Sequence, residues 1–251
     1  MRNPTATSLL GFTLIEMAIV LVISGLLLGG AIQAIHGQST KRRAEKTLDQ
    51  LQEIREALLG FAVVNGRLPC PDTDFDGNEN VVANACVANA SGQFTGVIPW
   101  NTLGVAPADA WTHLFSYQVT GLFADAVALA TTGSGTLTGE TCPPAAPVAC
   151  PTAANASFSL RCQCEGDLSI QNAAGTTLVA SVPAVILSHG ANGLGAYTMN
   201  GSRIPTTGAM AAETQNSDLT NGIFRQGGDD LVVWISPLVL KYRMVKAGRL
   251  P

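Results

Sequence analysis

The sequence predicts an α+β protein in which a long N-terminal α-helix packs on an antiparallel β-sheet. The first observation is a helical hydrophobic pattern that runs without a proline from residue 12 to residue 65. The second is a series of short apolar runs beyond residue 113, bounded by Gly, Pro, Asn and Asp, which is typical of strands.

The predicted helix has an apolar first part, residues 12–35, with Glu16 as its one charge. At about 1.5 Å per residue, this range is long enough to cross a bilayer core of about 30 Å. The sequence therefore predicts a transmembrane helix. An acid inside such a helix is costly and needs a partner, and no basic side chain lies at helical spacing from Glu16. A plain membrane anchor and a secretory signal peptide are alternative interpretations.

The residues Gly-Phe-Thr-Leu-Ile-Glu, from Gly11 to Glu16, closely resemble the processing site of type IV prepilins and type II secretion pseudopilins. The resemblance implies that a prepilin peptidase cleaves after Gly11 and methylates the new N-terminus at Phe12. It also implies that Glu16 pairs with the N-terminal amine of a neighbouring subunit during filament assembly. Such pairing would make a buried charge tolerable.

The predicted organisation follows from this resemblance and from the hydrophobic pattern. Residues 1–11 form a leader peptide, 12–35 the transmembrane helix, 36–65 its amphipathic continuation, and 66–251 a globular pilin-like head. We expect a single-pass protein of the inner membrane with its head in the periplasm, incorporated in a periplasmic or surface filament.

The continuation and the head can be divided further. Apolar residues at intervals of three and four predict one buried stripe on the continuation: Ala44, Leu48, Leu51, Ile54, Leu58 and Phe61. Asn65-Gly66 predicts the helix end, and Pro237 begins a predicted last helix over 237–247. The predicted strands are Leu114–Val119, Leu122–Ala130, Ser157–Cys162, Leu168–Gln171, Thr177–Val182, Ala184–Leu187 and Leu231–Ile235.

Asp72, Asp74 and Asp76 alternate before Gly77, which is the beginning of an EF-hand type calcium loop. The twelfth position of that pattern is Ala83 in place of a bidentate Glu, so Glu79, Asn78 or backbone carbonyls would have to complete the site. The alternative is a turn in which the carboxylates bind their own backbone. The sequence thus offers Ca²⁺ as its cofactor candidate.

Three segments of the head bear a looser resemblance to the C-terminal region of major pseudopilins of type II secretion. They are Asp109–Tyr117, Ser188–Gly193 and Asp229–Trp234, and inserts around 131–156 and 200–228 separate this chain from the family pattern. The resemblance implies a second calcium site at the loops of Asn192 and of Asp229 and Asp230.

All six cysteines lie beyond residue 69, which favours an oxidising compartment and disulfides over zinc. A local pair between the first two and a loop closed by the third and fourth are two of the open pairings. The candidates are Cys70, Cys86, Cys142, Cys150, Cys162 and Cys164.

Composition and motifs limit the function. Of the 251 residues, 13% are charged, the formal charge is −4, and residues 68–240 contain only Arg161, Arg203 and Arg225 as bases. Nucleic acid is therefore not an expected partner, because phosphate binding needs a basic surface. The histidines of the head, His113 and His189, belong to no G-x-S-x-G or H-E-x-x-H pattern, so we expect no enzyme and no catalytic residue.

The motif at Gly11–Glu16 and the apolar run that follows favour one function over two alternatives. We expect a structural subunit of a type IV pilus-like filament, namely a type II secretion pseudopilin that acts in protein export. The alternatives are a minor pilin for adhesion, motility or surface display, and a periplasmic binding protein with an ordinary signal peptide. The resemblance implies as partners other pilin or pseudopilin subunits, the prepilin peptidase and an inner-membrane assembly platform.

Overall fold

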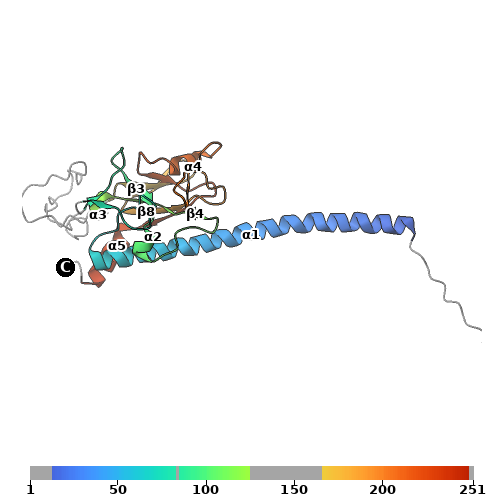
Figure 1. Ribbon diagram of the computed structural model, residues 1–251, viewed down its shortest axis with the longest axis horizontal. Coiled ribbons are helices and arrows are strands. Elements are labelled where there is room, and N and C mark those ends of the chain that lie inside the picture. The colour runs from blue at the N-terminus through green and yellow to red at the C-terminus, as the bar shows by residue number, and fades with distance from the viewer. Residues whose placement is uncertain (1–12, 83–84, 125–165, 249–251) are drawn as a thin grey trace, which may run out of the picture. The chain divides into compact units, whose positions relative to one another are not determined.

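The computed structural model describes most of the chain as a mixed α+β structure with an antiparallel sheet (Figure 1). The described residues are 13–82, 85–124 and 166–248, without the side chains of residues 27–38, 85 and 122. The chain divides into two compact units, residues 1–43 and residues 44–251. Helix α1, Leu14–Asn65, contributes residues to both units.

In the first unit, α1 begins with a reciprocal cap between Thr13 and Glu16. The Thr13 hydroxyl accepts the Glu16 amide at 3.3 Å, and the Glu16 carboxylate accepts the Thr13 amide at 3.4 Å. Such a capping box pairs amides that the first turn of a helix leaves without partners. Glu16 therefore has a local backbone partner, although no basic side chain lies at helical spacing from it.

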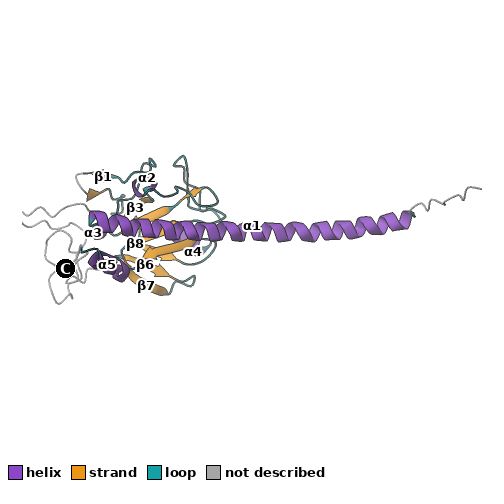
Figure 2. Cartoon of the chain, turned by 90° about the horizontal axis from the view of Figure 1, so that it is seen from below, coloured by secondary structure: helices purple, strands orange, loops and turns teal. Residues whose placement is uncertain are grey.

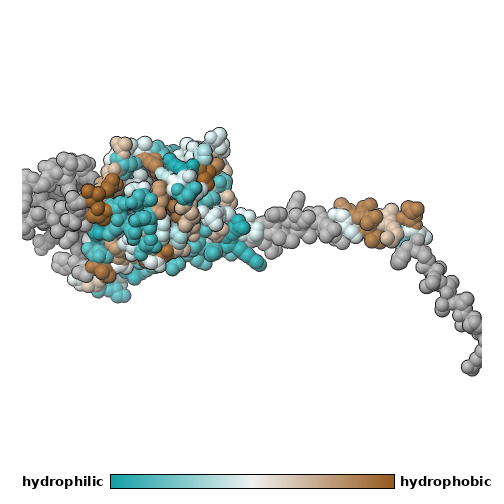
Figure 3. All heavy atoms as spheres, in the orientation of Figure 1, coloured by the Kyte–Doolittle hydropathy of each residue, from teal (hydrophilic) through white to brown (hydrophobic). Residues whose placement is uncertain are grey.

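The described turns that follow carry mostly apolar side chains, which are exposed. Figure 3 shows hydrophobic side chains along the visible face of this part of α1. The exposed apolar residues are Leu14, Ile15, Met17, Ile19, Val20, Leu21, Val22, Ile23 and Leu26. Among the described residues, no helix combines the length and the apolar character that a membrane crossing requires. The predicted span 12–35 lies partly outside the described residues, because Phe12 and the side chains of 27–38 are not described.

In the second unit, α1 buries one stripe of side chains against the head. The buried residues recur at intervals of three and four, as an amphipathic helix requires: Thr47, Leu51, Ile54, Leu58 and Ala62, with Leu59 beside them. The predicted stripe was wrong at Leu48, whose side chain is 41% exposed. The side chain of Leu48 lies one residue, or about 100°, around the helix from Thr47, which takes the buried position.

The end of α1 is fixed by two local features. The Asn65 side chain donates to the carbonyl of Phe61 at 3.0 Å, and Gly66 follows with φ of 75°. A glycine in this left-handed conformation ends many helices because it carries no Cβ.

The main sheet has four antiparallel strands in the order β11-β8-β5-β3. They are β3 (Phe94–Val97), β5 (Ser116–Val119), β8 (Ala184–Ser188) and β11 (Leu231–Ile235). Residues 44–65 of α1 cross one face of this sheet (Figure 2).

A second sheet consists of β6 (Leu168–Gln171), β7 (Thr177–Val182) and β10 (Ile223–Arg225). The β6 and β7 ranges are those that the sequence predicted. The sequence predicted an antiparallel sheet and no strand at 223–225, whereas β10 pairs in parallel with β6. Residues 200–228 look like an insert relative to the family pattern. Their local sequence pattern does not indicate that residues 223–225 pair with β6.

Strand β8 connects the two hydrophobic cores of the head. Alternate side chains of a strand point to opposite faces, so Ile186 packs in the core beneath α1 and Val185 packs against the second sheet. All five residues of β8 are consequently buried. On the α1 side, Leu240 and Met244 of helix α5 (Pro237–Lys246) complete the core.

The predicted strand 122–130 was wrong where it is described, because residues 121–124 form helix α3. Short apolar runs fit a helix and a strand equally well by periodicity. Its remainder and the predicted strand 157–162 lie outside the described residues. The other short elements are β1 (Val81–Val82), β2 (Ala85–Cys86), α2 (Trp100–Leu103), β4 (His113–Leu114), β9 (Tyr197–Thr198) and α4 (Ala211–Asn216).

Candidate metal centre

Three carboxylates meet where the loop after β8, helix α4 and the turn before β11 converge. Glu213 belongs to α4, and Asp229 and Asp230 immediately precede β11. Each offers an oxygen within 4.8 Å of the others. Glu213 is 1% exposed and Asp230 is 7% exposed, so negative charge is concentrated in a buried place.

Hydrogen bonds from Asn192 and Met210 hold this cluster together. The backbone amide of Asn192 donates to Asp229 Oδ2 at 2.7 Å, and its side-chain amide donates to Glu213 Oε1 at 2.9 Å. The amide of Met210 donates to Glu213 Oε2 at 2.7 Å. Both oxygens of Glu213 and one oxygen of Asp229 therefore have donors.

Asn216 positions the third carboxylate. Its side-chain amide donates to Asp230 Oδ2 at 2.7 Å and to the carbonyl of Arg225 at 2.9 Å. Its side-chain oxygen accepts the amide of Arg225 at 2.7 Å. Strand β10 and the turn of Asp230 are thus connected through one amide side chain.

Two carboxylate oxygens remain without a donor. Asp229 Oδ1 and Asp230 Oδ1 are buried and have no hydrogen-bond partner among the described residues. An unpaired buried oxygen is costly, and an unpaired buried charge is more so. A divalent cation satisfies such oxygens directly, and Ca²⁺ takes about six to eight oxygen ligands from carboxylates, carbonyls and water. The donor set of this cluster therefore fits Ca²⁺.

The acid–base properties reflect the crowding. Burial, together with the charges of Glu213 and Asp229, raises the pKa of Asp230 to about 7. Burial also raises the pKa of Asp229, against the lowering effect of the Asn192 amide. For Glu213, burial acts upward, but the donors Met210 and Asn192 hold its pKa below the usual value. A cation would remove the cost of ionising the two aspartates.

Glycines allow the loops to approach one another. A Cβ on Gly228 would lie 2.6 Å from Glu213 Oε1, and one on Gly190 would lie 2.2 Å from the backbone oxygen of Asp229. Both glycines have positive φ, 70° and 60° respectively. The close packing of these loops therefore requires glycine at both positions.

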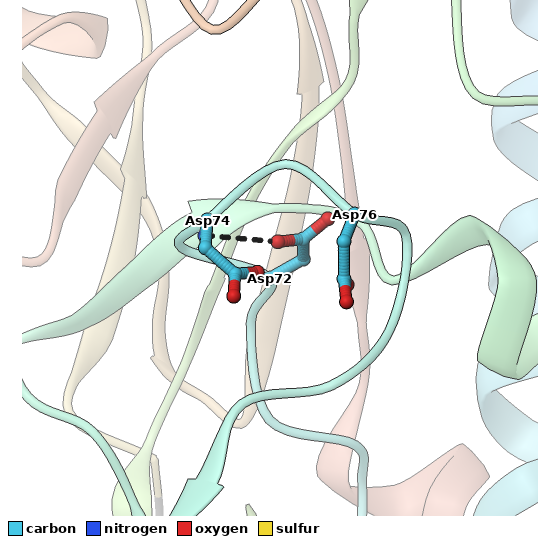
Figure 4. A group of neighbouring side chains, drawn as sticks. All are labelled: Asp72, Asp74 and Asp76. Carbon is cyan, nitrogen blue, oxygen red and sulfur yellow. Dashed lines mark hydrogen bonds between the residues drawn. The ribbon is translucent and has the colours of Figure 1, made fainter.

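The predicted aspartate loop also brings its three carboxylates together (Figure 4). Asp72 is fully buried, and its Oδ1 accepts the amides of Asp74 at 3.1 Å and Phe75 at 2.7 Å. Its Oδ2 accepts the amide of Gly77 at 2.7 Å. Burial raises the pKa of Asp72, and these amides oppose the effect. Asp72 therefore fits the alternative interpretation of this loop, in which a carboxylate accepts hydrogen bonds from the backbone of its own turn.

Glu79, one of the groups proposed to complete that loop, has another partner. Glu79 forms a two-pronged ion pair with Arg67 at 2.7 Å and accepts the amide of Cys70 at 3.0 Å. The twelfth position, Ala83, lies outside the described residues. Asp74 and Asp76 are exposed, so this loop has no orphaned buried oxygen comparable to that of Asp230.

The remaining predicted site residues fall into two groups. Cys70 and Cys86 form a disulfide, and Glu16 caps α1. Outside the described residues lie Gly11, Phe12, Cys142, Cys150, Cys162 and Cys164.

The three segments of the looser resemblance lie side by side. Ser188 Oγ donates to Asp109 Oδ2 at 2.6 Å, His113 Nδ1 lies 3.2 Å from the carbonyl of Gly190, and Asn192 reaches Asp229. Ser188 thus faces a carboxylate, whereas Ser116 Oγ lies 3.1 Å from His189 Nε2. Burial is the main reason that the pKa of His189 is lowered to about 3. The imidazole ring is therefore neutral near pH 7.

Glu213 was not among the site residues that the sequence predicted. The residue lies in the region interpreted as an insert, and its spacing from Asp229 matches no short motif. Only the packing of α4 against β10 brings it to the aspartates. Comparisons with protein-family models, with curated proteins and with solved structures found no match for this chain.

Proposed function

We propose that this protein is a structural subunit of a type IV pilus-like filament and acts as a pseudopilin in type II protein export. The observation that carries the proposal is the sequence from Gly11 to Glu16, followed by the apolar run 12–35. In this proposal a prepilin peptidase cleaves after Gly11, methylates Phe12 and leaves an apolar helix that anchors the subunit in the inner membrane and then packs in the filament.

The geometry of the first turn supports this role for Glu16. Its carboxylate reaches the amide of Thr13, the residue directly after Phe12. Cleavage would create a positive amine at Phe12, and a negative group at a helix N-terminus is favourable. The same carboxylate is then available to the amine of a neighbouring subunit at the same level of a filament.

In the same proposal the head holds Ca²⁺ through Asp229 and Asp230, with Glu213 beside them. The cation supplies positive charge and oxygen coordination, and it performs no reaction. Asn192, Met210 and Asn216 orient the carboxylates through the hydrogen bonds described above. The bound head would present one fixed arrangement of the loop after β8, α4 and the turn before β11.

N-terminal mass spectrometry of the purified protein tests the proposal. We expect a mature chain that begins with methylated Phe12, and an uncut precursor for Gly11→Val. Gly25→Val is a control, because its Cβ meets nothing within 4 Å and the position lies outside the processing motif. An intact Met1 in cells with an active peptidase contradicts the proposal. A terminus near residue 35 would favour a periplasmic binding protein.

Pseudopilin and minor pilin share this N-terminal chemistry, so a second experiment separates them. Affinity purification should recover the inner-membrane platform of a secretion system for a pseudopilin. Recovery in sheared surface filaments would favour the minor pilin, with adhesion, motility or surface display as its role.

A further inference from the structure

The outer edge of β3 has one hydrogen-bonding position without a partner. At one end, the carbonyl of Gln93 accepts the amide of Asn89 at 2.8 Å. At the other end, Val97 and Asp72 exchange two backbone hydrogen bonds of 2.8 and 3.0 Å. Alternate residues of a strand direct their backbone amide and carbonyl to the same edge. The amide and carbonyl of Thr95, which lies between Gln93 and Val97, therefore also point to this outer edge. No group in the described part of the chain pairs with the amide and carbonyl of Thr95.

A cavity of about 240 Å³ lies in this gap. Its lining includes Thr95 and Gly96 of β3, together with Thr73, which follows Asp72, and Asn89, which bonds to Gln93. Its apolar walls are Phe75, Val87, Tyr197 and Leu219, and every residue that lines it is uncharged. The volume is below the roughly 300–1,000 Å³ of sites for drug-sized ligands, so it suits a single side chain.

The aromatic wall is held firmly. The Phe75 ring centroid lies 5.1 Å from that of Tyr197, and the Arg203 guanidinium lies 5.6 Å from the centroid of the Tyr197 ring. Phe75 has φ of 65°, which a bulky residue adopts only where its surroundings enforce it. The Asp72 carboxylate provides that enforcement through the Phe75 amide.

We propose that this gap is a docking site for an extended, uncharged peptide segment of a partner protein. The peptide backbone would supply the donor and acceptor that Thr95 lacks, and one apolar side chain would enter the cavity, as in strand addition at a sheet edge. Metal ions, phosphates and carboxylates find no opposite charge in this lining. The inference goes beyond filament assembly and does not depend on the carboxylate cluster.

The test uses the full chain in detergent micelles, labelled with ¹⁵N, and the blocked peptide acetyl-Val-Leu-Val-amide as probe. We expect saturable shifts of the amide signals of Thr95, Gly96 and Val87. Acetyl-Val-Glu-Val-amide should bind at least about tenfold more weakly, because its carboxylate would be buried in an uncharged lining, next to the acidic loop of Asp72, Asp74 and Asp76. Absence of saturable shifts, or equal binding of the two peptides, overturns the proposal.

Two variants locate the binding. Thr95→Pro removes the amide that faces the cavity, at an edge position where proline is tolerated, and Thr95→Ala is its control because the backbone groups remain. Ala88→Phe fills the cavity from an exposed position and leaves β3 unchanged. Loss of binding in Thr95→Pro and Ala88→Phe, with retention in Thr95→Ala, supports the proposal. Unchanged binding in Ala88→Phe overturns the proposal. It is also overturned if the same amide signals shift when the protein concentration is raised without peptide, because a second copy of this chain would then occupy the gap.

Discussion

The backbone amide of Asn192 lies 2.7 Å from Asp229 Oδ2 and joins two loops that are 37 residues apart in the chain. The side chain of the same asparagine reaches Glu213 at 2.9 Å. One residue therefore connects the loop after β8 with both α4 and the turn before β11.

Calcium should bind at the cluster of Asp229 and Asp230. We expect Asp230→Asn to weaken calcium binding by at least about tenfold, because a charged ligand and its orphaned oxygen are replaced by an amide. Asp76→Asn is the matched control, since Asp76 is exposed and belongs to the other acidic loop. Isothermal titration of the full chain measures both. Weaker binding in the control alone would assign the cation to the aspartate loop.

The metal-free protein should show a pH dependence that originates from Asp230. Its folded pKa of about 7 exceeds the ordinary 3.8, so its contribution to stability is present below about pH 4 and is lost as the pH rises toward 7. His189 acts in the opposite direction, because its pKa is lowered from 6.5 to about 3. The measured quantity is therefore the difference between wild type and Asp230→Asn.

With chelator present, Asp230→Asn should gain melting temperature relative to wild type between pH 5 and pH 8. The reason is that the wild type must carry a buried charge at the higher pH, whereas the amide carries none. Added calcium should raise the melting temperature of wild type at pH 8 and leave the variant nearly unchanged. A constant difference between the two proteins at both pH values would exclude Asp230 as the source.

Glu16→Ala should be processed normally and assemble poorly. The substitution removes the acceptor for the Thr13 amide and, in the proposed filament, the acceptor for the neighbouring amine. Glu45→Ala is the control, because it removes an exposed acid farther along the same helix. Fractionation of assembled and membrane-bound subunits measures the effect. Normal incorporation of Glu16→Ala would contradict the pairing.

The stripe of α1 can be tested with a matched pair of leucines. Leu58→Ala should cost about 2–5 kcal/mol of unfolding free energy, because Leu58 is fully buried in the core. Leu48→Ala should cost less than about 1 kcal/mol, since its side chain is 41% exposed. Chemical denaturation of the two variants measures the difference. Equal losses would mean that both leucines lie in the stripe.

The disulfide should contribute to the stability of the head. Cys70→Ser with Cys86→Ser removes a bridge between residues separated by 16 positions, which costs about 2–4 kcal/mol in the chain-entropy account. Denaturation of the double variant, compared with wild type under oxidising conditions, measures the loss. An unchanged midpoint would indicate that other contacts, such as the Arg67–Glu79 pair, fix this loop.

The local sequence pattern was sufficient to predict the elements whose structure depends on residues close in the chain. Strands β6, β7 and β11 begin and end at the predicted residues, and α5 begins at Pro237. The end of α1 at Asn65 follows from its own side chain and from Gly66. Such features depend on alternation, on caps and on φ preferences, which a few consecutive residues encode.

Tertiary structure alone decided which distant residues meet. Glu213 carries no motif, yet it lies beside Asp229 and Asp230 because β10 pairs with β6 and brings α4 to the turn before β11. Likewise, Thr95 was left facing a cavity between two flanking backbone contacts. Hydrogen bonding and packing across the chain set these outcomes, because burial forces each polar group to find a partner in space, wherever that partner lies in the sequence.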